Sequence, residues 1–178
     1  MHSHSQNEIM SSDERPDIQV NPLINLLRHL VRASRLAVLK FRLGSKLELG
    51  NNVYIGRNAL IISPEKAVIG SNVGIANNLH VETNINIGND VLISSRVSFI
   101  GNDHRFDDSN KTVFWGGRNA PATIILEGDN LIGYGATIIG NIKIGKGCIV
   151  GASAVVTKDL PPNTICAGVP ARVIRNRF

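Results

Sequence analysis

The sequence predicts an all-β fold in which short strands wind about five times around one axis, preceded by a single amphipathic helix. Three observations predict it. An apolar residue recurs at every sixth position over most of the chain, glycine often follows it, and turn-forming residues come next. Aromatic residues are only 4% of the 178 residues, against 17 glycines, which suits a chain that turns often and packs small aliphatic side chains. With 43% hydrophobic residues, the chain is expected to form one globular domain.

The segment before the repeat divides into a tail and a helix. Residues 1–20 are polar and lack the apolar core of a signal peptide, so we expect a disordered tail. From Pro22 the apolar spacing is helical, and it predicts a basic amphipathic helix over 21–43 that is too charged to span a bilayer. Such a helix either caps the open end of the solenoid or contacts a membrane surface through residues 22–42. Both alternatives stay open.

The six-residue repeat lies within residues 44–163. Its fifteen apolar positions are Leu49, Ile55, Ile61, Ile69, Ile75, Val81, Ile87, Ile93, Phe99, Leu126, Ile132, Ile138, Ile144, Val150 and Val156. Six residues turn a helix by about 600°, so these side chains would not form one stripe. A long straight strand would bury the polar residues two positions later, such as Asn51 and Ser71. The chain therefore makes short strands and corners, and three sides close a coil of about eighteen residues.

The repeat is interrupted at residues 100–125, since the count from Phe99 to Leu126 is not a multiple of six. Long loops on a rigid scaffold usually carry function. This one has His104 at its root. A hydroxyl is a poor nucleophile at neutral pH, and imidazole has a suitable pKa to take its proton. We therefore expect His104 to act as a general base.

The repeat resembles that of the hexapeptide-repeat acyltransferases. The similarity covers residues 46–178 and rests on the runs IGSNVG, IGNDVL, IGYGAT, IGKGCI and VGASAV and on the closing VVTKDLPPNTICAGVPARVI. Within the family, the likeness is to acetyl-CoA-dependent O-acetyltransferases that act on sugars and other hydroxylated acceptors. The resemblance implies a left-handed parallel β-helix, a homotrimer and active sites between neighbouring subunits. The segment that ends at His104 resembles the one that ends in the family's catalytic histidine.

The resemblance also implies residues that bind acetyl-CoA and the acceptor. The cofactor positions, to which the C-terminal tail 164–178 contributes, are Tyr134, Ala152, Thr157, Lys158, Arg172 and Arg175. Similar enzymes carry an asparagine that faces the acceptor, at the place of Asn77 or Asn78. Asp103 and Trp115 complete the candidates for acceptor or oxyanion contact. The alternatives are a corner role for the asparagines and a packing role for Trp115.

Metal and covalent chemistry are not expected. A zinc site of this scaffold needs three histidines at one interface, and beyond His104 only His80 could contribute. Cys148 and Cys166 occupy positions typical of packing, and two cysteines make no disulfide framework, which favours a reducing compartment.

These observations favour direct transfer of acetyl from acetyl-CoA to a sugar hydroxyl. The acceptor is expected in the biosynthesis of a surface polysaccharide, capsule or lipopolysaccharide. We expect a cytoplasmic protein, with peripheral contact at the inner face of the membrane as an open alternative. Two other functions are weighed: an acetyltransferase for a small amine, amino acid or antibiotic, and a structural β-helix without catalysis.

The net charge of +5 does not predict a nucleic-acid partner. Residues 18–47 hold six Lys or Arg and no acid, and residues 160–178 hold three Arg and no acid. The rest of the chain has ten basic and fourteen acidic residues. A nucleic-acid footprint would not segregate in this way, so the positive charge is assigned to the helix and to the cofactor site.

Overall fold

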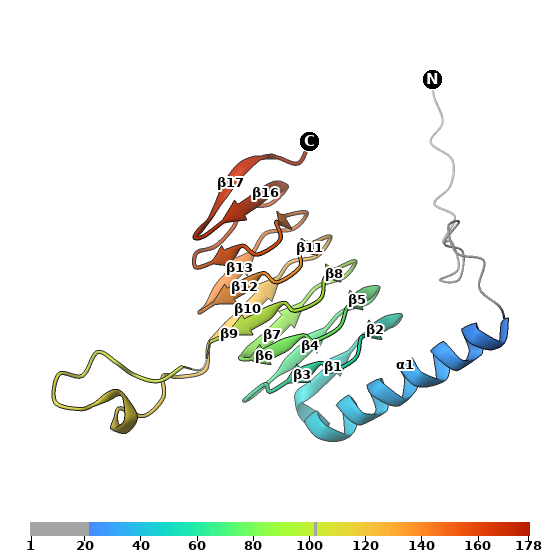
Figure 1. The fold of residues 1–178 in the computed structure, drawn as a ribbon, viewed down its shortest axis with the longest axis horizontal. Coiled ribbons are helices and arrows are strands. Elements are labelled where there is room, and N and C mark those ends of the chain that lie inside the picture. The colour runs from blue at the N-terminus through green and yellow to red at the C-terminus, as the bar shows by residue number, and fades with distance from the viewer. Residues whose placement is uncertain (1–21, 102) are drawn as a thin grey trace.

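A computed structural model describes residues 22–101 and 103–178, in which a helix is followed by a parallel β-solenoid (Figure 1). The expected polar tail, residues 1–20, lies outside the described residues. The predicted left-handed parallel β-helix with one N-terminal helix is confirmed, and it has about six turns where about five were expected.

Three sheets form the three sides of the solenoid. Sheet A contains β1 (Leu47–Leu49), β4 (Ala67–Ile69), β7 (Asn84–Ile87), β10 (Thr123–Leu126) and β13 (Ile142–Ile144). Sheet B contains β2 (Val53–Ile55), β5 (Val73–Ile75), β8 (Leu92–Ile93), β11 (Leu131–Ile132), β14 (Ile149–Val150), β16 (Thr164–Gly168) and β17 (Ala171–Asn176). Sheet C contains β3 (Leu60–Ile61), β6 (His80–Glu82), β9 (Ser98–Ile100), β12 (Thr137–Ile139) and β15 (Val155–Val156).

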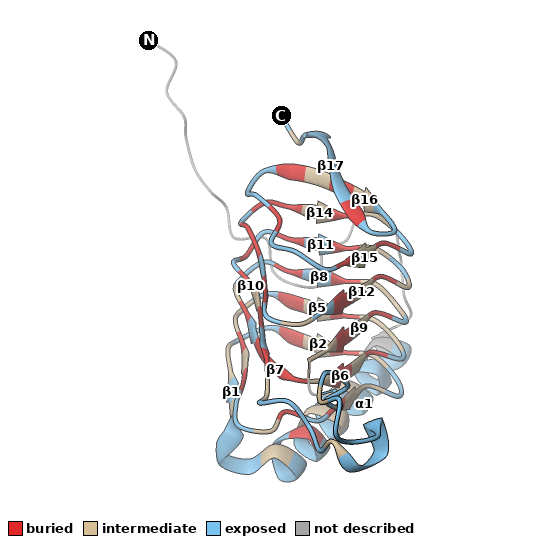
Figure 2. Ribbon diagram, turned by 90° about the vertical axis from the view of Figure 1, so that its left-hand side faces the viewer, coloured by how far each residue is buried: buried red, intermediate tan, exposed pale blue. Residues whose placement is uncertain are grey.

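The core is the stack of side chains that the repeat predicts. Fourteen of the fifteen repeat positions are buried, and Leu49 in the first coil is half-buried. Figure 2 shows buried residues at the same place in successive coils. Ala67 pairs with Ile85, eighteen residues further on, whereas Leu47 pairs with Ala67, twenty residues further on. The two extra residues of the first coil account for the slip in the repeat.

The corners depend on a left-handed backbone at the third residue after a buried aliphatic. The non-glycine residues in this conformation at such corners are Asn52, Asn58, Asn72, Asn78, Asp90, Arg96, Asp129, Ser153 and Asn163. Asn and Asp are the non-glycine residues that tolerate a positive φ best. The glycine that directly follows the aliphatic residue is required because neighbouring coils approach closely at this position. A Cβ on Gly133 would lie 2.5 Å from the backbone nitrogen of Ala152.

The last turn of the solenoid is shorter than the eighteen residues that three six-residue repeats give. Ile149 of β14 pairs with Ile165 of β16, only sixteen residues further on. The chain then folds back, and β17 pairs antiparallel with β16. Residues 164–178, expected as a tail, therefore extend sheet B.

The helix α1 (Pro22–Leu43) lies under the first coil, and the short 3-10 turn Gly44–Lys46 connects it to β1. Leu39 is buried in the core, and Leu36 and Leu43 pack against it. The guanidinium of Arg32 lies 4.7 Å from the centre of the Tyr54 ring. The C-terminal half of α1 thus covers the open end of the solenoid. None of the described helices is long and apolar enough to cross a membrane.

Asn130 ties neighbouring coils together from inside. It is 3% exposed, its Nδ2 donates to the carbonyls of Gly145 (2.8 Å) and Cys148 (3.1 Å), and its Oδ1 accepts from the Gly128 N–H (3.0 Å). One amide therefore satisfies three backbone groups.

We predict that Asn130→Ala lowers the free energy of unfolding by about 2–4 kcal/mol, because buried backbone groups lose their partners. Urea titration followed by circular dichroism measures it. Asn110→Ala, at an exposed position of the loop, is the matched control and should change stability by less than about 0.5 kcal/mol. Equal losses for both variants would contradict the role given to Asn130.

Candidate functional site

The loop that interrupts the repeat leaves the solenoid after Ile100, where β9 ends, and returns at Thr123, where β10 begins. Figure 1 shows it projecting away from the coils. Its root is narrow, because the Ala122 N–H donates to the Gly101 carbonyl (2.9 Å) and the buried Thr83 hydroxyl donates to the Ala122 carbonyl (2.6 Å). A Cβ on Gly101 would lie 2.5 Å from Thr83 Oγ1, so this crossing requires glycine.

The two ends of the loop pair with each other just beyond the root. The Arg105 N–H donates to the Gly117 carbonyl and the Asn119 N–H to the Asp103 carbonyl, both at 2.9 Å. His104 lies opposite Arg118 in this short antiparallel ladder. The backbone that carries the predicted base is therefore fixed on both sides.

The imidazole of His104 is half-buried. Its Nδ1 is shielded from solvent and has no hydrogen-bond partner within residues 22–101 and 103–178. The Asp103 carboxylate accepts the backbone N–H of His104 at 2.7 Å, so it fixes the main chain of the histidine. An unpaired, enclosed ring nitrogen is costly unless another group meets it.

Trp115 lies in the 3-10 turn Val113–Trp115 of the loop. It is 75% exposed, and its ring meets that of Phe114 edge-on with centroids 4.9 Å apart. Phe114 and Phe106 are also exposed. The loop therefore presents an uncovered aromatic surface in the single chain.

Two corners of the solenoid carry most of the predicted site residues, and β17 carries the other two. The loop root occupies the corner between sheets C and A (the C–A corner), and Thr157 and Lys158 follow β15 at the same corner, two coils further on. Neighbouring strands lie about 4.8 Å apart, so two coils separate these residues from the root by about 10 Å. Both side chains are exposed.

Tyr134 and Ala152 lie at the corner between sheets B and C (the B–C corner), in successive coils. The Ser153 N–H donates to the Tyr134 carbonyl at 2.8 Å, which stacks one coil on the next. Tyr134 is half-exposed, and the Arg96 guanidinium lies 5.9 Å from the centre of its ring.

Asn77 and Asn78 occupy the B–C corner two coils before Tyr134, away from the corner of His104 in the same chain. Asn77 Oδ1 accepts the backbone N–H of Arg57 at 2.7 Å, and Asn78 Oδ1 accepts from Asn58 Nδ2 at 3.2 Å. Both amides thus join neighbouring coils.

The outer face of sheet C lies between the two corners and carries a row of polar residues, of which sequence reasoning considered only His80. His80 Nε2 lies 3.2 Å from Glu82 Oε1 on β6. Ser98 and Thr137 continue the row of His80 in the next two coils. The available signal was their position: each comes directly before the buried residue of every third side.

Arg172 and Arg175 lie on β17, opposite Ala167 and Ile165 of β16. Both side chains are exposed, and each donates to a neighbouring carbonyl of its own strand. They therefore place positive charge at the C-terminal end of sheet B.

Cys148 and Cys166 are fully buried and unpaired, with their sulfurs 3.9 Å apart. Burial raises the pKa of the Cys148 thiol, which disfavours the reactive thiolate. Among the described residues, no group of three His, Cys, Asp or Glu side chains could hold a metal ion.

Comparisons with known proteins relate the repeat to acyl transfer. No family model matches the chain. It is 50% identical over 52 residues to 2,3,4,5-tetrahydropyridine-2,6-dicarboxylate N-acetyltransferase of Staphylococcus aureus, a match covering 29% of this chain and 22% of that protein. It is 36% identical over 88 residues to the putative acetyltransferase C18B11.09c of Schizosaccharomyces pombe, covering 49% of this chain and 41% of that protein. The chain therefore spans less than half the length of these curated relatives.

The solved structures match over most of their length. The hexapeptide-repeat acetyltransferase VCA0836 of Vibrio cholerae, complexed with acetyl-CoA, is 26% identical with a TM-score of 0.61, covering 89% of this chain and 91% of that one. This chain has the hexapeptide-repeat acetyltransferase fold. The N-acyltransferase AntD of Bacillus cereus, in complex with dTDP and 3-hydroxybutyryl-CoA, is 28% identical with a TM-score of 0.65 over 75% of this chain and 74% of that one. Galactoside acetyltransferase in complex with coenzyme A is 26% identical with a TM-score of 0.61 over 81% and 70%.

We predict that neither cysteine of the native protein reacts with Ellman's reagent at pH 8, because both thiols are buried and the pKa of Cys148 is raised. The same protein in denaturant should release two equivalents of thionitrobenzoate, matching its two cysteines. Rapid reaction of a thiol in the folded protein would contradict their assignment to packing.

Proposed function

We propose that this protein transfers acetyl from acetyl-CoA to a hydroxyl of a sugar, with His104 as the general base. The observation that carries the proposal is the position of His104: its backbone is fixed at the loop root, at the corner that also holds Lys158. The complexes of similar proteins with acetyl-CoA and coenzyme A support the choice of donor.

The acyl donor is a long molecule with phosphates at one end. In the proposed site, the backbone at Tyr134 and Ala152 flanks its pantetheine arm. Thr157, Lys158, Arg172 and Arg175 hold its nucleotide end. These four side chains are exposed, and cationic side chains recognise phosphate through charge-assisted hydrogen bonds.

A homotrimer would bring the separated parts together. Tyr134 and Asn77 lie at the B–C corner, whereas His104 lies at the C–A corner. We propose that one subunit's B–C corner faces the next subunit's C–A corner and that each site forms between them. The exposed aromatic side chains of the loop, Phe106, Phe114 and Trp115, support this arrangement because a neighbour would cover them.

The reaction requires His104 to take a proton from the acceptor hydroxyl and then to give it to the departing coenzyme A. His104 accepts the acceptor's hydroxyl proton on Nε2, since Nδ1 is enclosed. The hydroxyl oxygen attacks the thioester carbonyl, a C–O bond forms and the C–S bond breaks. The proton then passes to the coenzyme A thiolate. Backbone N–H groups, with Trp115 or Asp103 at the acceptor, are the candidates for stabilising the oxyanion and orienting the substrate.

The acceptor class has two candidates. A sugar hydroxyl is supported by similarity to galactoside acetyltransferase. We place the reaction in surface polysaccharide biosynthesis in the cytoplasm. An amine acceptor is favoured by a specific observation: AntD and the Staphylococcus aureus relative are both N-acyltransferases by name. A panel of nucleotide sugars, free sugars, lipid-linked glycans and amines, scored by release of coenzyme A, separates the two.

We predict that His104→Ala lowers kcat for acetyl transfer by about 10²–10⁴-fold, because the hydroxyl loses its base. The Michaelis constant for acetyl-CoA should stay within about threefold, since the side chain acts on the acceptor. Release of coenzyme A with the best acceptor of the panel measures both constants.

The matched control is His29→Ala, which removes a histidine from α1 and should leave kcat unchanged. Full turnover by His104→Ala on a good acceptor would show that the general base lies elsewhere.

A further inference from the structure

The helix α1 has two different apolar faces, and the solenoid uses only one of them. Leu36, Leu39 and Leu43 pack on the first coil. An α-helix turns by about 100° per residue, so Leu30, nine residues before Leu39, projects on the opposite side. Leu30 is 58% exposed. The helix therefore covers the coil with a narrow leucine stripe and turns a second apolar face outward.

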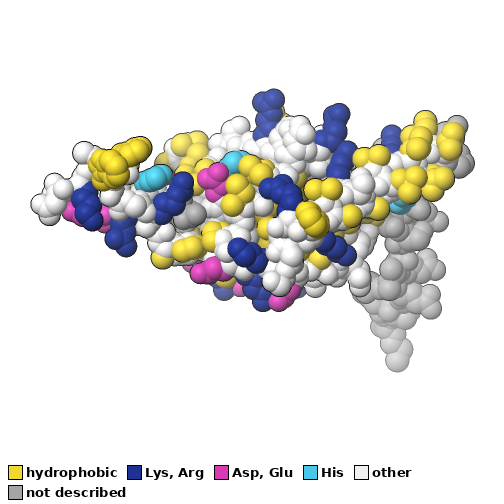
Figure 3. Space-filling model, turned by 90° about the horizontal axis from the view of Figure 1, so that it is seen from below, with side chains coloured by type: hydrophobic (Ala, Val, Ile, Leu, Met, Phe, Trp, Pro, Cys, Tyr) yellow, Lys and Arg dark blue, Asp and Glu magenta, His cyan; other side chains and the backbone are white. Residues whose placement is uncertain are grey.

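We name the second surface the outer face of α1. It consists of Leu26, Leu27, Leu30, Val38 and Phe41, which are 57%, 54%, 58%, 57% and 90% exposed. Figure 3, a view onto the underside of the molecule, shows hydrophobic side chains interleaved with basic ones toward the end where the chain enters α1. Several large apolar side chains on one exposed helix face mark an interaction surface.

The charge of α1 is of one sign. Arg28, Arg35 and Arg42 are spaced seven residues apart, so they form a row along one flank of the outer face. Lys40 lies toward the other flank, and the helix contains no acidic residue. An apolar face flanked by cations is typical of helices that lie in the interface of an anionic membrane.

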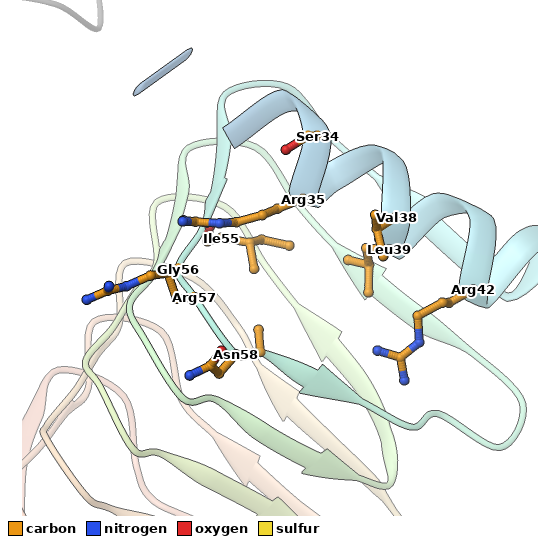
Figure 4. Close-up of a pocket in the computed structure, with 10 residues that line it drawn as sticks. Ser34, Arg35, Val38, Leu39, Arg42, Ile55, Gly56, Arg57 and Asn58 are labelled. Atoms are coloured by element: carbon orange, nitrogen blue, oxygen red, sulfur yellow. The ribbon is translucent and has the colours of Figure 1, made fainter. Parts of the chain in front are cut away.

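A groove continues the basic flank onto the solenoid. It has a volume of about 300 Å³, lies between α1 and the first coil, and is lined by Arg35, Arg42 and Arg57 (Figure 4). Val38 of the outer face also lines it, so the groove opens beside that face. Arg35 already donates to the Ile55 carbonyl at 3.3 Å, which holds its guanidinium in the groove. Guanidinium groups beside an apolar surface suit a phosphate that carries acyl chains.

We propose that α1 docks this protein onto an anionic phospholipid surface. The outer face enters the interface, and Arg28, Arg35, Arg42 and Arg57 contact lipid phosphates. Charge argues against a second copy of the chain as the occupant, because two outer faces brought together would oppose arginine rows of equal sign. The proposal does not rest on acetyl transfer, since binding to lipid needs neither acyl donor nor acceptor.

The test is sedimentation of the full chain with sucrose-loaded vesicles. We expect binding to vesicles of equal parts phosphatidylglycerol and phosphatidylcholine, weaker binding to phosphatidylcholine alone, and a loss of binding as salt is raised. Leu27→Glu with Leu30→Glu should weaken binding at least about tenfold, because both side chains leave the apolar layer. Arg28→Gln with Arg42→Gln should weaken it by about tenfold through lost attraction to phosphate.

Two matched controls sit away from α1. Ile174→Glu changes an exposed aliphatic residue of β17, and Lys146→Gln removes an exposed cation between β13 and β14. Both should bind like the wild type. Circular dichroism checks folding of each variant, and if the leucine variant does not fold, the arginine variant decides the question.

Three results would overturn the proposal. One is equal or absent binding to the two kinds of vesicle. Another is unchanged binding by a folded arginine variant. The third is a wild-type protein that ignores vesicles while the leucine variant has a smaller mass by light scattering, which would make the outer face an interface between copies of this chain.

Discussion

The structure depends on one constraint, which is that each coil must return the chain to the same position one strand spacing further along the axis. Parallel backbone hydrogen bonds between coils impose it, since they require neighbouring coils to keep their register. The chain satisfies this constraint by turning sharply at its corners, where residues such as Asn72 and Asp90 have a left-handed backbone. Aliphatic side chains then stack inside the solenoid, and side chains between them face solvent at regular intervals.

The same constraint lets a corner carry an inserted loop whose side chains are held in fixed positions. A loop inserted at a corner leaves the stack intact if its two ends meet, and Gly101 and Ala122 meet there through a backbone hydrogen bond. His104 is thereby held by the rigid solenoid although it belongs to a loop. Lys158, two coils further along the same corner, keeps a fixed separation from His104, and such preorganisation would favour the proposed binding of coenzyme A.

The sequence could predict the features of the fold that follow the six-residue repeat. The stack, the slip in the first coil and the excursion follow from counting sixes, because burial recurs with that period. Other features of the structure leave no pattern in the sequence that would distinguish them from their alternatives. Asn77 bonds the neighbouring coil, yet in sequence it is indistinguishable from an asparagine that faces a substrate. Both faces of α1 are leucine-rich, so the sequence does not indicate that Leu39 is buried while Leu30 is exposed. The shortened sixth turn breaks the count that identifies the others.

We propose that the solenoid brings the donor's thioester to His104, with the nucleotide end at Lys158, Arg172 and Arg175. A crystal structure of the full chain with coenzyme A measures this most directly. We expect the coenzyme A sulfur within about 4 Å of the His104 imidazole in the assembled site, and the phosphates on those three cations. Coenzyme A bound with its sulfur remote from every His104 of the assembly would contradict it.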